Sequence, residues 1–389
     1  MNVAIFTDND FEKINGVTTT FAAALRHVPA GMRLRIYTSA TLAVDDHDYL
    51  AVRSVGVPIP FYGQMRMYLP RLRAFLKRAR ADRIDLIHLT TPGPIGLAAL
   101  FVAWRLQLPL VGSFHTDLAA YAATLSGSPR LGALMREYMR WPYGKCSRIL
   151  VPSEHTKQLL IEAKANPEKI DLWPRGVDTT LFSPVKRSAL RREAWHVSDR
   201  RAALLYVGRV SREKGLDILP ALAERLHALG LEHRFIIVGE GPLLSTLRSR
   251  MSDAVFTGPL GRDAVADAYA ASDLFVFPSP TDTAGNVVLE AQASGVPVII
   301  SRSGGPRENM RAGRTGRVCH TLDPDEWARA IVAQLRDPAF AATRVAAREY
   351  ALTRTWPLAL EPLFRAYREV LEGAAPATPR VIQAAVQGA

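Results

Sequence analysis

Residues 278–301 read PSPTDTAGNVVLEAQASGVPVIIS, and this stretch sets the pattern on which the fold is built. The apolar run LFVF at 274–277 predicts a buried strand just before it, and VPVII near its end predicts another. Between the two strands lie Asp282 in a polar loop, a flexible Gly285-Asn286 pair and a helix that carries Glu290. In an open parallel sheet ligands bind beyond the carboxyl ends of the strands, and a helix N-terminus suits an anion. The two acids would touch different parts of one extended ligand, and a nucleotide sugar is the working hypothesis.

The alternation of strand, loop and helix runs twice along the chain. In the first half, strands are expected at 3–7, 33–38, 84–89, 108–114, 149–151 and 170–173. After a charged connection at 183–201, strands are expected again at 203–207, 235–238, 255–256 and 274–277. Two successive α/β alternations predict two Rossmann-like domains that face each other across a cleft. The expected divisions are a first domain at 1–184, a second at 185–356, a last helix at 357–372 and a flexible tail at 373–389.

The composition is that of a globular protein. Of the 389 residues, 48% are hydrophobic and 22% are charged, so disorder is not expected. Cys146 and Cys319 give no disulfide framework and no metal-ligand spacing, which favours a reducing, cytoplasmic compartment. The opening MNVAIFTDND is expected to be a first strand and not a signal peptide. The apolar run at 95–102 is too short to span a bilayer, so no membrane span is expected.

Positive charge is concentrated in one stretch of a chain whose formal net charge is +12. Residues 66–83 contain one acid, Asp82, and seven basic side chains: Arg66, Arg71, Arg73, Lys77, Arg78, Arg80 and Arg83. A helix over this stretch would place its apolar residues along one side and its cations on the other. Such a helix would be either the solvated side of a core-packed element or a contact with an anionic membrane surface. Nucleic acid is disfavoured, because no recognition motif accompanies the charge.

Two cations, two glycines and a histidine add to the expected site. Arg209 and Lys214 follow the first strand of the second domain, where they would neutralise a diphosphate. Gly16 follows the first strand of the chain, and Gly241 lies at the end of a strand in the second domain; each would either meet the ligand or form a simple turn. His115 lies just past the strand at 108–114, at the sheet edge where ligands collect, although a lone histidine is more often structural.

The ordered set of segments resembles a known enzyme family. The second half contains LLYVGRVSREKGLDIL, FIIVGEGPLL, VFTGPL, the stretch quoted above and a Gly304-Gly305 pair, and the first half contains INGV, SFHTDLAAY, VPSEHT and RGVDTTLFSP. Together they resemble the retaining glycosyltransferases of family 4, and in particular lipid-directed members such as phosphatidylinositol mannosyltransferases and sulfoquinovosyl transferases. The resemblance implies the GT-B fold, with the acceptor on the first domain, the donor on the second and the last helix crossing back onto the first.

The resemblance also implies a role for each matching residue. Arg209 and Lys214 would hold the diphosphate and stabilise the leaving nucleotide, and Glu290 would bind the ribose. His115 would contact the transferred sugar near its 6-hydroxyl, with Asp282 also near the sugar. The remaining donor contacts would come from Gly16, Gly241, Gly285, Asn286 and Val287. No divalent metal and no cofactor other than the donor substrate are expected.

Two residues depart from the family pattern. Asp282 replaces the usual glutamate, which withdraws the carboxylate by about 1.5 Å, and Ala284 stands where a large residue is usual. The expected reaction still moves a hexose from a nucleoside diphosphate to an acceptor hydroxyl with retention of configuration. The resemblance favours GDP-mannose as donor and a lipid or glycan acceptor at the inner face of the cytoplasmic membrane.

Three alternatives stay open. A UDP-sugar donor of the glucose or glucuronate type is the second choice, because nothing in the sequence distinguishes guanine from uracil recognition. A nucleotide-sugar epimerase or dinucleotide enzyme also uses Rossmann units, but no G-x-G-x-x-G follows the first strand. A catalytically weakened nucleotide-sugar-binding protein would keep the fold and account for the departures at Asp282 and Ala284.

Overall fold

The computed structural model describes residues 1–9, 15–59, 62–198 and 200–373. In this part of the chain the first domain contains an eight-stranded sheet with the order β10-β9-β8-β7-β1-β2-β4-β3, parallel except for the short edge strand β3. Its strands are β1 (Asn2–Phe6), β2 (Arg33–Ala40), β3 (Val44–Asp45), β4 (Tyr49–Arg53), β7 (Leu86–Leu89), β8 (Leu110–Ser113), β9 (Arg148–Val151) and β10 (Ile170–Leu172).

Helices cover both faces of this sheet, which is why its central strands are continuous apolar runs. Along β1, Val3 and Ile5 pack on one face while Ala4 and Phe6 pack on the other, as the two-residue period of a strand requires. The helices of this domain are α1 (Gly16–Arg26), α2 (Leu72–Ala81), α3 (Pro94–Leu106), α4 (Leu118–Ser126), α5 (Pro129–Gly144) and α6 (Glu154–Glu162), with a short 3-10 turn at Pro167–Lys169.

The basic stretch at 66–83 is not one helix, so that expectation was wrong. Its first residues belong to β6 (Tyr62–Tyr68), which pairs antiparallel with β5 (Gly56–Ile59) in a separate hairpin. Pro70 then keeps Leu69 out of the helical region, and α2 begins only at Leu72. The helix is therefore ten residues long, with Phe75 and Ala79 buried.

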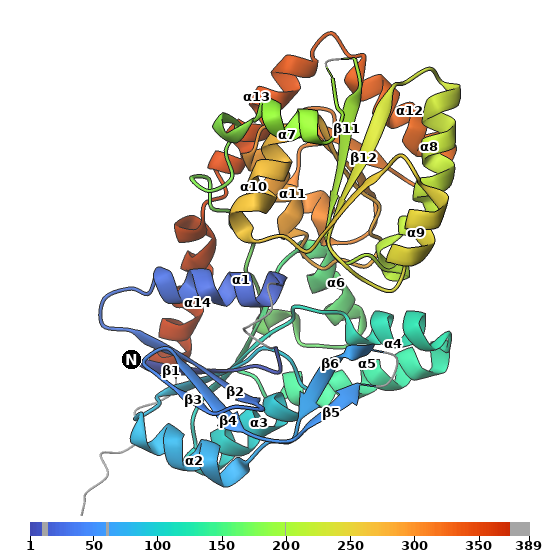
Figure 1. Cartoon of the computed structure of the whole chain (residues 1–389). Coiled ribbons are helices and arrows are strands. Elements are labelled where there is room, and N and C mark those ends of the chain that lie inside the picture. Colours follow the sequence, from blue (N-terminus) through green and yellow to red (C-terminus); the bar gives the residue numbers. More distant parts are fainter. Residues whose placement is uncertain (10–14, 60–61, 199, 374–389) are drawn as a thin grey trace, which may run out of the picture.

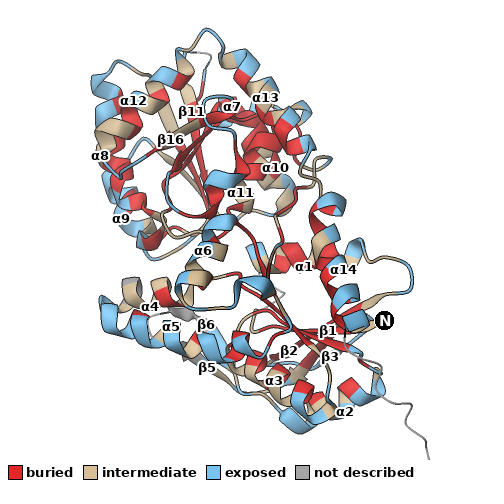
Figure 2. Ribbon diagram, turned by 180° about the vertical axis from the view of Figure 1, so that it is seen from behind, coloured by how far each residue is buried: buried red, intermediate tan, exposed pale blue. Residues whose placement is uncertain are grey.

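The second domain has a fully parallel sheet of six strands in the described chain, with the order β13-β12-β11-β14-β15-β16. Its core is one continuous cluster of buried side chains, and the strands that form it are red in Figure 2. The strands are β11 (Ala202–Val207), β12 (His233–Val238), β13 (Val255–Gly258), β14 (Leu274–Phe277), β15 (Val298–Ser301) and β16 (Gly316–Cys319). The order reverses between β11 and β14, and a crevice at such a switch point is where open α/β sheets bind ligands.

The helices of the second domain surround this sheet. They are α7 (Ala189–Ala194), α8 (Leu219–Ala228), α9 (Leu244–Arg250), α10 (Arg262–Ala271), α11 (Asn286–Ala293), α12 (Pro324–Leu335) and α13 (Phe340–Leu352). Short 3-10 turns lie at Pro184–Lys186, Arg212–Lys214, Leu216–Ile218 and Gly305–Asn309. The turn at Pro184–Lys186 and α7 pack against α10, so the expected connection at 183–201 is part of the second domain's surface.

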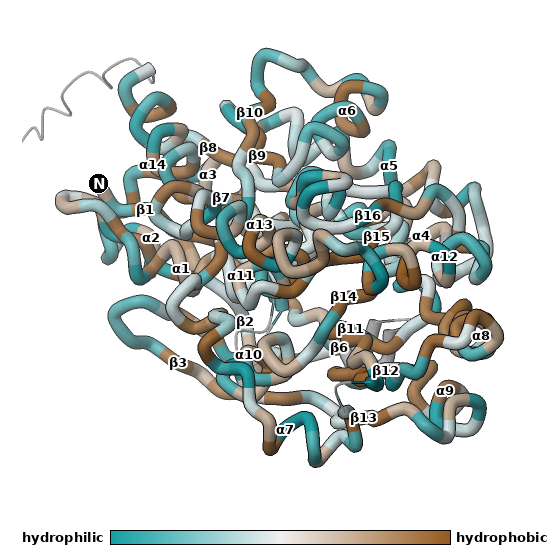
Figure 3. Tube along the Cα trace, turned by 90° about the horizontal axis from the view of Figure 1, so that it is seen from above, coloured by the Kyte–Doolittle hydropathy of each residue, from teal (hydrophilic) through white to brown (hydrophobic). Residues whose placement is uncertain are grey.

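The chain crosses between the domains twice. Val177 and Phe182 already pack in the core of the second domain, ahead of the expected division at 184. After α13 the chain returns through α14 (Trp356–Gly373), whose Leu360 and Tyr367 are fully buried against the first domain. This helix lies beside α1 (Figures 1 and 3), which confirms the expected crossover. The tail after residue 373 lies outside the described residues.

Candidate active site

The loop between β14 and α11 forms one wall of the site. Gly285 precedes the first residue of α11 and has φ 68° and ψ 57°. A Cβ at Gly285 would lie 2.7 Å from Cγ of Pro306, so both the left-handed backbone and the close packing require glycine. Among the described residues no side chain caps α11, which leaves the N–H groups of its first turn, including those of Asn286 and Val287, available to an anion.

The Gly-Gly pair after β15 supports this loop from behind. The Gly305 N–H donates to the carbonyl of Asp282 at 2.9 Å, and a Cβ at Gly305 would lie 1.8 Å from the carbonyl oxygen of Thr283. The carbonyl of Ala284 accepts a hydrogen bond from Asn309 Nδ2 at 2.5 Å. These backbone contacts hold the loop whatever side chain stands at 284.

Lys214 and Asp282 meet across the switch point. The ammonium of Lys214 lies 2.8 and 2.9 Å from the two carboxylate oxygens of Asp282, and it interacts electrostatically with Tyr121 of α4 in the other domain. Burial disfavours the charged ammonium, but the carboxylate outweighs burial and raises the pKa of Lys214 above its ordinary value. Lys214 is therefore a permanent buried cation, held opposite the first domain.

Arg209 lies on the same loop, directly after β11. Its carbonyl accepts a hydrogen bond from the hydroxyl of Tyr206 at 2.8 Å, and its Nε is 4.0 Å from Oε1 of the buried Glu213. The Glu213 carboxylate in turn accepts a hydrogen bond from the Ser211 hydroxyl at 2.6 Å. The loop thus places its two expected phosphate ligands on a framework of internal hydrogen bonds.

The glycines after β12 pack directly on this loop. A Cβ at Gly239 would lie 2.0 Å from the carbonyl oxygen of Gly208, and a Cβ at Gly241 would lie 2.3 Å from that of Val210. Neither backbone can move away cheaply, so both positions need glycine for packing alone. The expected donor contact of Gly241 stays a prediction.

Glu290 lies in the second turn of α11 and points toward α10. The hydroxyl of the buried Tyr269 donates to its Oε2 at 3.2 Å. Burial raises the pKa of Glu290 to about 7, since a carboxylate loses hydration in this position. At neutral pH the group is poised between an acceptor-only carboxylate and a neutral acid, and hydroxyl donors from a ligand would favour the charged form.

Gly16 brings the first domain against the loop between β14 and α11, which we call the donor loop after the ligand expected there. Asn15 caps α1 by accepting hydrogen bonds from Val17 and Thr18, which fixes where the helix starts. A Cβ at Gly16 would lie 3.9 Å from Nδ2 of Asn286. That Nδ2 atom is buried and has no hydrogen-bond partner among the described residues, so a donor group is left at this junction.

His115 follows β8 and is almost fully buried, with 9% of its surface exposed. Arg175 donates to its Nδ1 at 2.8 Å, and its Nε2 lies 2.7 Å from Oγ of Ser113. Burial, with a further contribution from the Arg175 charge, lowers the pKa of His115 well below its ordinary value. Both ring nitrogens are engaged by the protein here, and the expected sugar contact of His115 stays a prediction.

Known proteins resemble this chain in both sequence and fold. The sequence model described as Glycosyltransferase Family 4 matches residues 14–181, and that described as Glycosyl transferases group 1 matches residues 201–337. Over 378 residues the chain is 32% identical to the GDP-mannose-dependent alpha-mannosyltransferase of Corynebacterium glutamicum, covering 95% of this chain and 89% of that protein. The chain belongs to glycosyltransferase family 4.

Two further proteins extend the comparison of this family 4 glycosyltransferase. It is 29% identical over 337 residues to sulfoquinovosyl transferase SQD2 of Arabidopsis thaliana, covering 83% of this chain and 64% of that protein. The structure of sucrose-phosphate synthase from Thermosynechococcus elongatus superposes with a TM-score of 0.76 at 21% identity, covering 96% of this chain and 99% of that one. The chain therefore has the GT-B fold and is a hexosyltransferase.

In this glycosyltransferase the two domains make side-chain contacts that were not predicted from the sequence. Thr283 of the donor loop donates to the carbonyl of His115 at 2.6 Å, and Ser153 donates to the carbonyl of Thr283 at 3.0 Å. The Glu308 carboxylate accepts hydrogen bonds from the backbone N–H groups of Glu154 and His155, at 2.7 and 2.8 Å. A residue of the second domain thus caps α6 of the first.

The sequence held partial signals for these missed residues. Serine is a favoured N-cap residue, and Ser153, which lies in VPSEHT just before α6, does accept the N–H of Thr156. Tyr121 and Arg175 lie inside the motifs SFHTDLAAY and RGVDTTLFSP, but nothing local pointed to their partners. Glu308 carries no signal, because its partners are more than 150 residues away in the chain.

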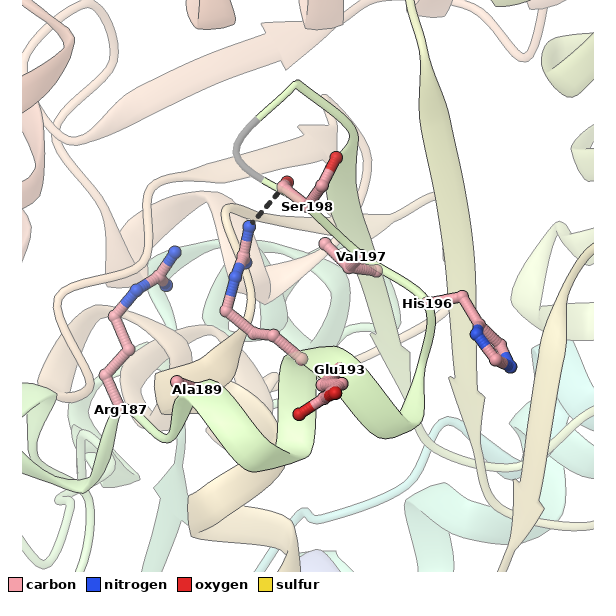
Figure 4. Close-up of a pocket in the computed structure, with 7 residues that line it drawn as sticks. Arg187, Ala189, Glu193, His196, Val197 and Ser198 are labelled. Carbon is pink, nitrogen blue, oxygen red and sulfur yellow. Dashed lines mark hydrogen bonds between the residues drawn. The ribbon is translucent and has the colours of Figure 1, made fainter.

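A separate surface hollow lies beside α7 (Figure 4). Arg187 and Arg192 line it, yet both donate to the carboxylate of Asp273, and Arg192 also donates to the carbonyl of Ser198 at 3.2 Å. Both guanidinium groups therefore already have hydrogen-bond acceptors within the protein. The hollow contains none of the residues expected to bind the donor.

Two features are absent from the described residues: a cluster of metal-binding side chains and a membrane-spanning helix. No group of three or more histidine, cysteine, aspartate or glutamate side chains there could hold a metal ion. Within residues 1–9, 15–59, 62–198 and 200–373, no helix has the length and apolar character needed to cross a membrane.

Proposed function

We propose that this glycosyltransferase moves mannose from GDP-mannose to a hydroxyl of a lipid or glycan acceptor, with retention of configuration. The observation that supports this most strongly is the identity of 32%, over 95% of the chain, to a protein named for GDP-mannose-dependent mannosyl transfer. The side chains that would serve a nucleotide sugar also gather at the switch point of the second sheet: Arg209, Lys214, Asp282, Asn286 and Glu290.

The donor would lie along the carboxyl edge of β11 and β14. Its diphosphate would compete with Asp282 for the ammonium of Lys214 and would accept from the unpaired Nδ2 of Asn286. Glu290 would accept hydrogen bonds from the ribose hydroxyls. Asp282, once released from Lys214, would lie next to the sugar, which would give the shortened acid a role in choosing it.

The transfer itself would take place on one face of the sugar. The bond from the anomeric carbon to the diphosphate oxygen breaks, and a bond to the acceptor oxygen forms on the same side. The acceptor proton passes to the departing phosphate oxygen, and Lys214 with Arg209 stabilises the negative charge that develops there. This scheme requires no divalent metal: transfer should survive EDTA, and loss in EDTA with recovery in magnesium would contradict it.

Lys214→Ala tests the role of the central cation. Removing one preorganised charge at a transition state typically costs about 10² to 10³ in turnover, and we expect a loss of that size in kcat. Lys186→Ala is the matched control, because Lys186 pairs with Asp263 on the surface of the same domain at 3.4 Å. Near-normal transfer by a folded Lys214→Ala protein would exclude the assigned role.

A thermal-shift series identifies the donor. A ligand that binds only the folded protein raises Tm with its concentration, so GDP-mannose should give a larger shift than UDP-glucose, UDP-glucuronate or UDP-N-acetylglucosamine. A larger shift with a UDP-sugar would replace the donor assignment and leave the reaction class intact. Binding without any transfer or donor hydrolysis would instead indicate a catalytically weakened nucleotide-sugar-binding protein.

A lipid acceptor at the cytoplasmic face of the membrane is part of this proposal, and two surfaces would serve it. On α2, Arg73, Lys77 and Arg80 are exposed, whereas Arg78 is committed to Asp45 and to Asp82, at 2.8 and 3.1 Å. The second surface is α5, which packs on α4 and carries the exposed apolar side chains Leu131, Leu134 and Trp141 between exposed arginines.

Flotation with vesicles of anionic lipid separates these two surfaces. Replacing Arg73, Lys77 and Arg80 with glutamine should abolish only salt-sensitive binding. Replacing Leu134 and Trp141 with serine should reduce the binding that persists at high salt. Failure of the unaltered protein to float at low salt would remove the membrane argument without affecting the reaction.

A further inference from the structure

A buried chain of hydrogen bonds joins the site to the crossover helix α14. Nη2 of Arg175 lies 2.8 Å from Nδ1 of His115, whose Nε2 lies 2.7 Å from Oγ of Ser113. The same Ser113 oxygen is 2.8 Å from Nε2 of His88, and Nδ1 of His88 is 2.5 Å from the hydroxyl of Tyr367 in α14. We call these five residues the buried relay.

The first member of the buried relay, Arg175, fixes the tautomer of His115. A guanidinium can only donate, so Nδ1 of His115 must accept and its Nε2 must carry the proton. Nε2–H then donates to Ser113. With the Ser113 hydroxyl as the donor to Nε2 of His88, Nδ1–H of His88 donates to Tyr367. Burial lowers the pKa of Arg175 to about 9, which keeps it protonated, and donating, at neutral pH.

The surroundings keep both imidazoles neutral. His88, Ser113 and Tyr367 are fully buried, and the rings of Phe21 and Trp173 make edge contacts with both histidines. Burial lowers the pKa of His88 to about 3, and that of His115 is lowered in the same direction. The buried relay therefore does not take up an extra proton near neutral pH. It fixes the tautomers and the orientations of the two imidazole rings.

The element that it orients touches the donor loop. The carbonyl of His115 accepts the hydrogen bond of Thr283, so the position of residue 115 sets how the first domain meets the second domain's loop. Tyr367 contacts His88 from α14, although the two residues are 279 positions apart in the chain. The apolar packing of α14 would hold the helix in place without a hydroxyl at this position.

We propose that His88 and Tyr367 are positioning residues that fix the tautomer and the orientation of His115, so that α14 takes part in shaping the transfer site. The effect on transfer rests on the proposed function, whereas the tautomers do not. Without Tyr367 the Nδ1–H of His88 loses its acceptor, and the favoured outcome is a shift of that proton to Nε2, which disturbs Ser113 and His115 in turn.

Proton-detected ¹⁵N spectra of the histidine-labelled full chain test this, with signals assigned by His88→Gln and His115→Gln. In the unaltered protein we expect His115 protonated at Nε2 and His88 protonated at Nδ1. Tyr367→Phe should move His88 toward the Nε2 form and lower kcat about fivefold, the equivalent of one lost hydrogen bond, with the donor KM unchanged. Tyr37→Phe removes another buried hydroxyl of this domain, bonded to Asp82 at 2.5 Å, and should change neither.

Each result of these measurements either supports or overturns the proposal. A His115 protonated at Nδ1 in the unaltered protein would overturn the proposal even if Tyr367→Phe failed to fold, because Arg175 cannot donate to that nitrogen. Unchanged tautomers and kcat in Tyr367→Phe would also overturn it. A change of tautomer in a protein that transfers no sugar would support the buried relay while excluding the proposed function.

Discussion

Removing the carboxylate of Glu308 should weaken the arrangement of the two domains described above. This side chain of the second domain accepts hydrogen bonds from the first two N–H groups of α6, while Ser153 accepts the third. In Glu308→Ala the two backbone donors would have only water as a partner. The effect would fall on the domain interface alone, since α6 keeps its own N-cap.

The expected magnitude is modest because Glu308 is exposed. Hydrogen bonds to a charged group contribute about 1.5–3 kcal/mol each when buried, but water competes at the surface. The typical cost of deleting a helix N-cap, about 1 kcal/mol, is the better scale here. That lowers the ratio of joined to separated domains about fivefold, so the apparent Kd for a donor that needs both domains would rise by up to about fivefold.

Calorimetric titration with GDP-mannose measures this change, and small-angle scattering checks the domain arrangement. Glu326→Ala is the matched control, because Glu326 accepts the backbone N–H groups of His320 and Thr321 within the second domain, at 2.6 and 2.9 Å. An unaltered Kd and radius of gyration in Glu308→Ala would refute the reasoning. So would an equal loss of affinity in Glu326→Ala.

Three further predictions concern the donor loop and α11. Donor affinity should fall as the pH is lowered from 8 to 6, because Glu290, with a pKa of about 7, becomes protonated and can no longer accept two hydrogen bonds as a carboxylate. Titrations with the donor at three pH values should show this decrease, and Glu290→Gln should remove it. The same raised pKa means that the folded state binds this proton more tightly than the unfolded state does. The contribution of Glu290 to the free energy of unfolding should therefore fall as the pH rises from about 4.5 toward 7. Denaturant unfolding of the unaltered protein and of Glu290→Gln across this range should show the difference. Gly285→Ala should lower Tm and donor affinity, because the left-handed backbone alone costs about 1–2 kcal/mol and the added methyl group meets Pro306. Gly261→Ala is the control: Gly261 has φ −67° and open space around it, so both Tm and donor affinity should stay near normal.

The parallel sheets could be predicted because their strands are unbroken apolar runs. LFVF at 274–277 and AIF within β1 have no polar face to confuse with a helix, and each is buried on both sides. The loop before α11 could be predicted too, because the Gly285-Asn286 pair indicates a turn followed by a helix start. The donor contacts of Asp282, Gly285 and Glu290 stay predictions.

The β5–β6 hairpin could not be predicted in the same way. Its second strand reads YGQMRMY and runs into the arginines that precede α2, so the charge suggested one long helix. Only pairing with residues 56–59 makes it a strand, and pairing is a tertiary fact. The same holds for His115. Its hydrogen-bond partners are Ser113 on β8 and Arg175 in the loop after β10, and no spacing in the chain reveals that both ring nitrogens are bound.

The two crossings between the domains pass each other at a single point. Val177 N–H donates to the carbonyl of Arg354 at 2.8 Å, and a Cβ at Gly176 would lie 2.8 Å from the Cα of Trp356. Two connections that are bonded to each other at one place act mechanically as a pivot. We therefore expect the domains to swing about this point and not to slide, which would return the donor loop to the same register against α6 and His115 after an opening.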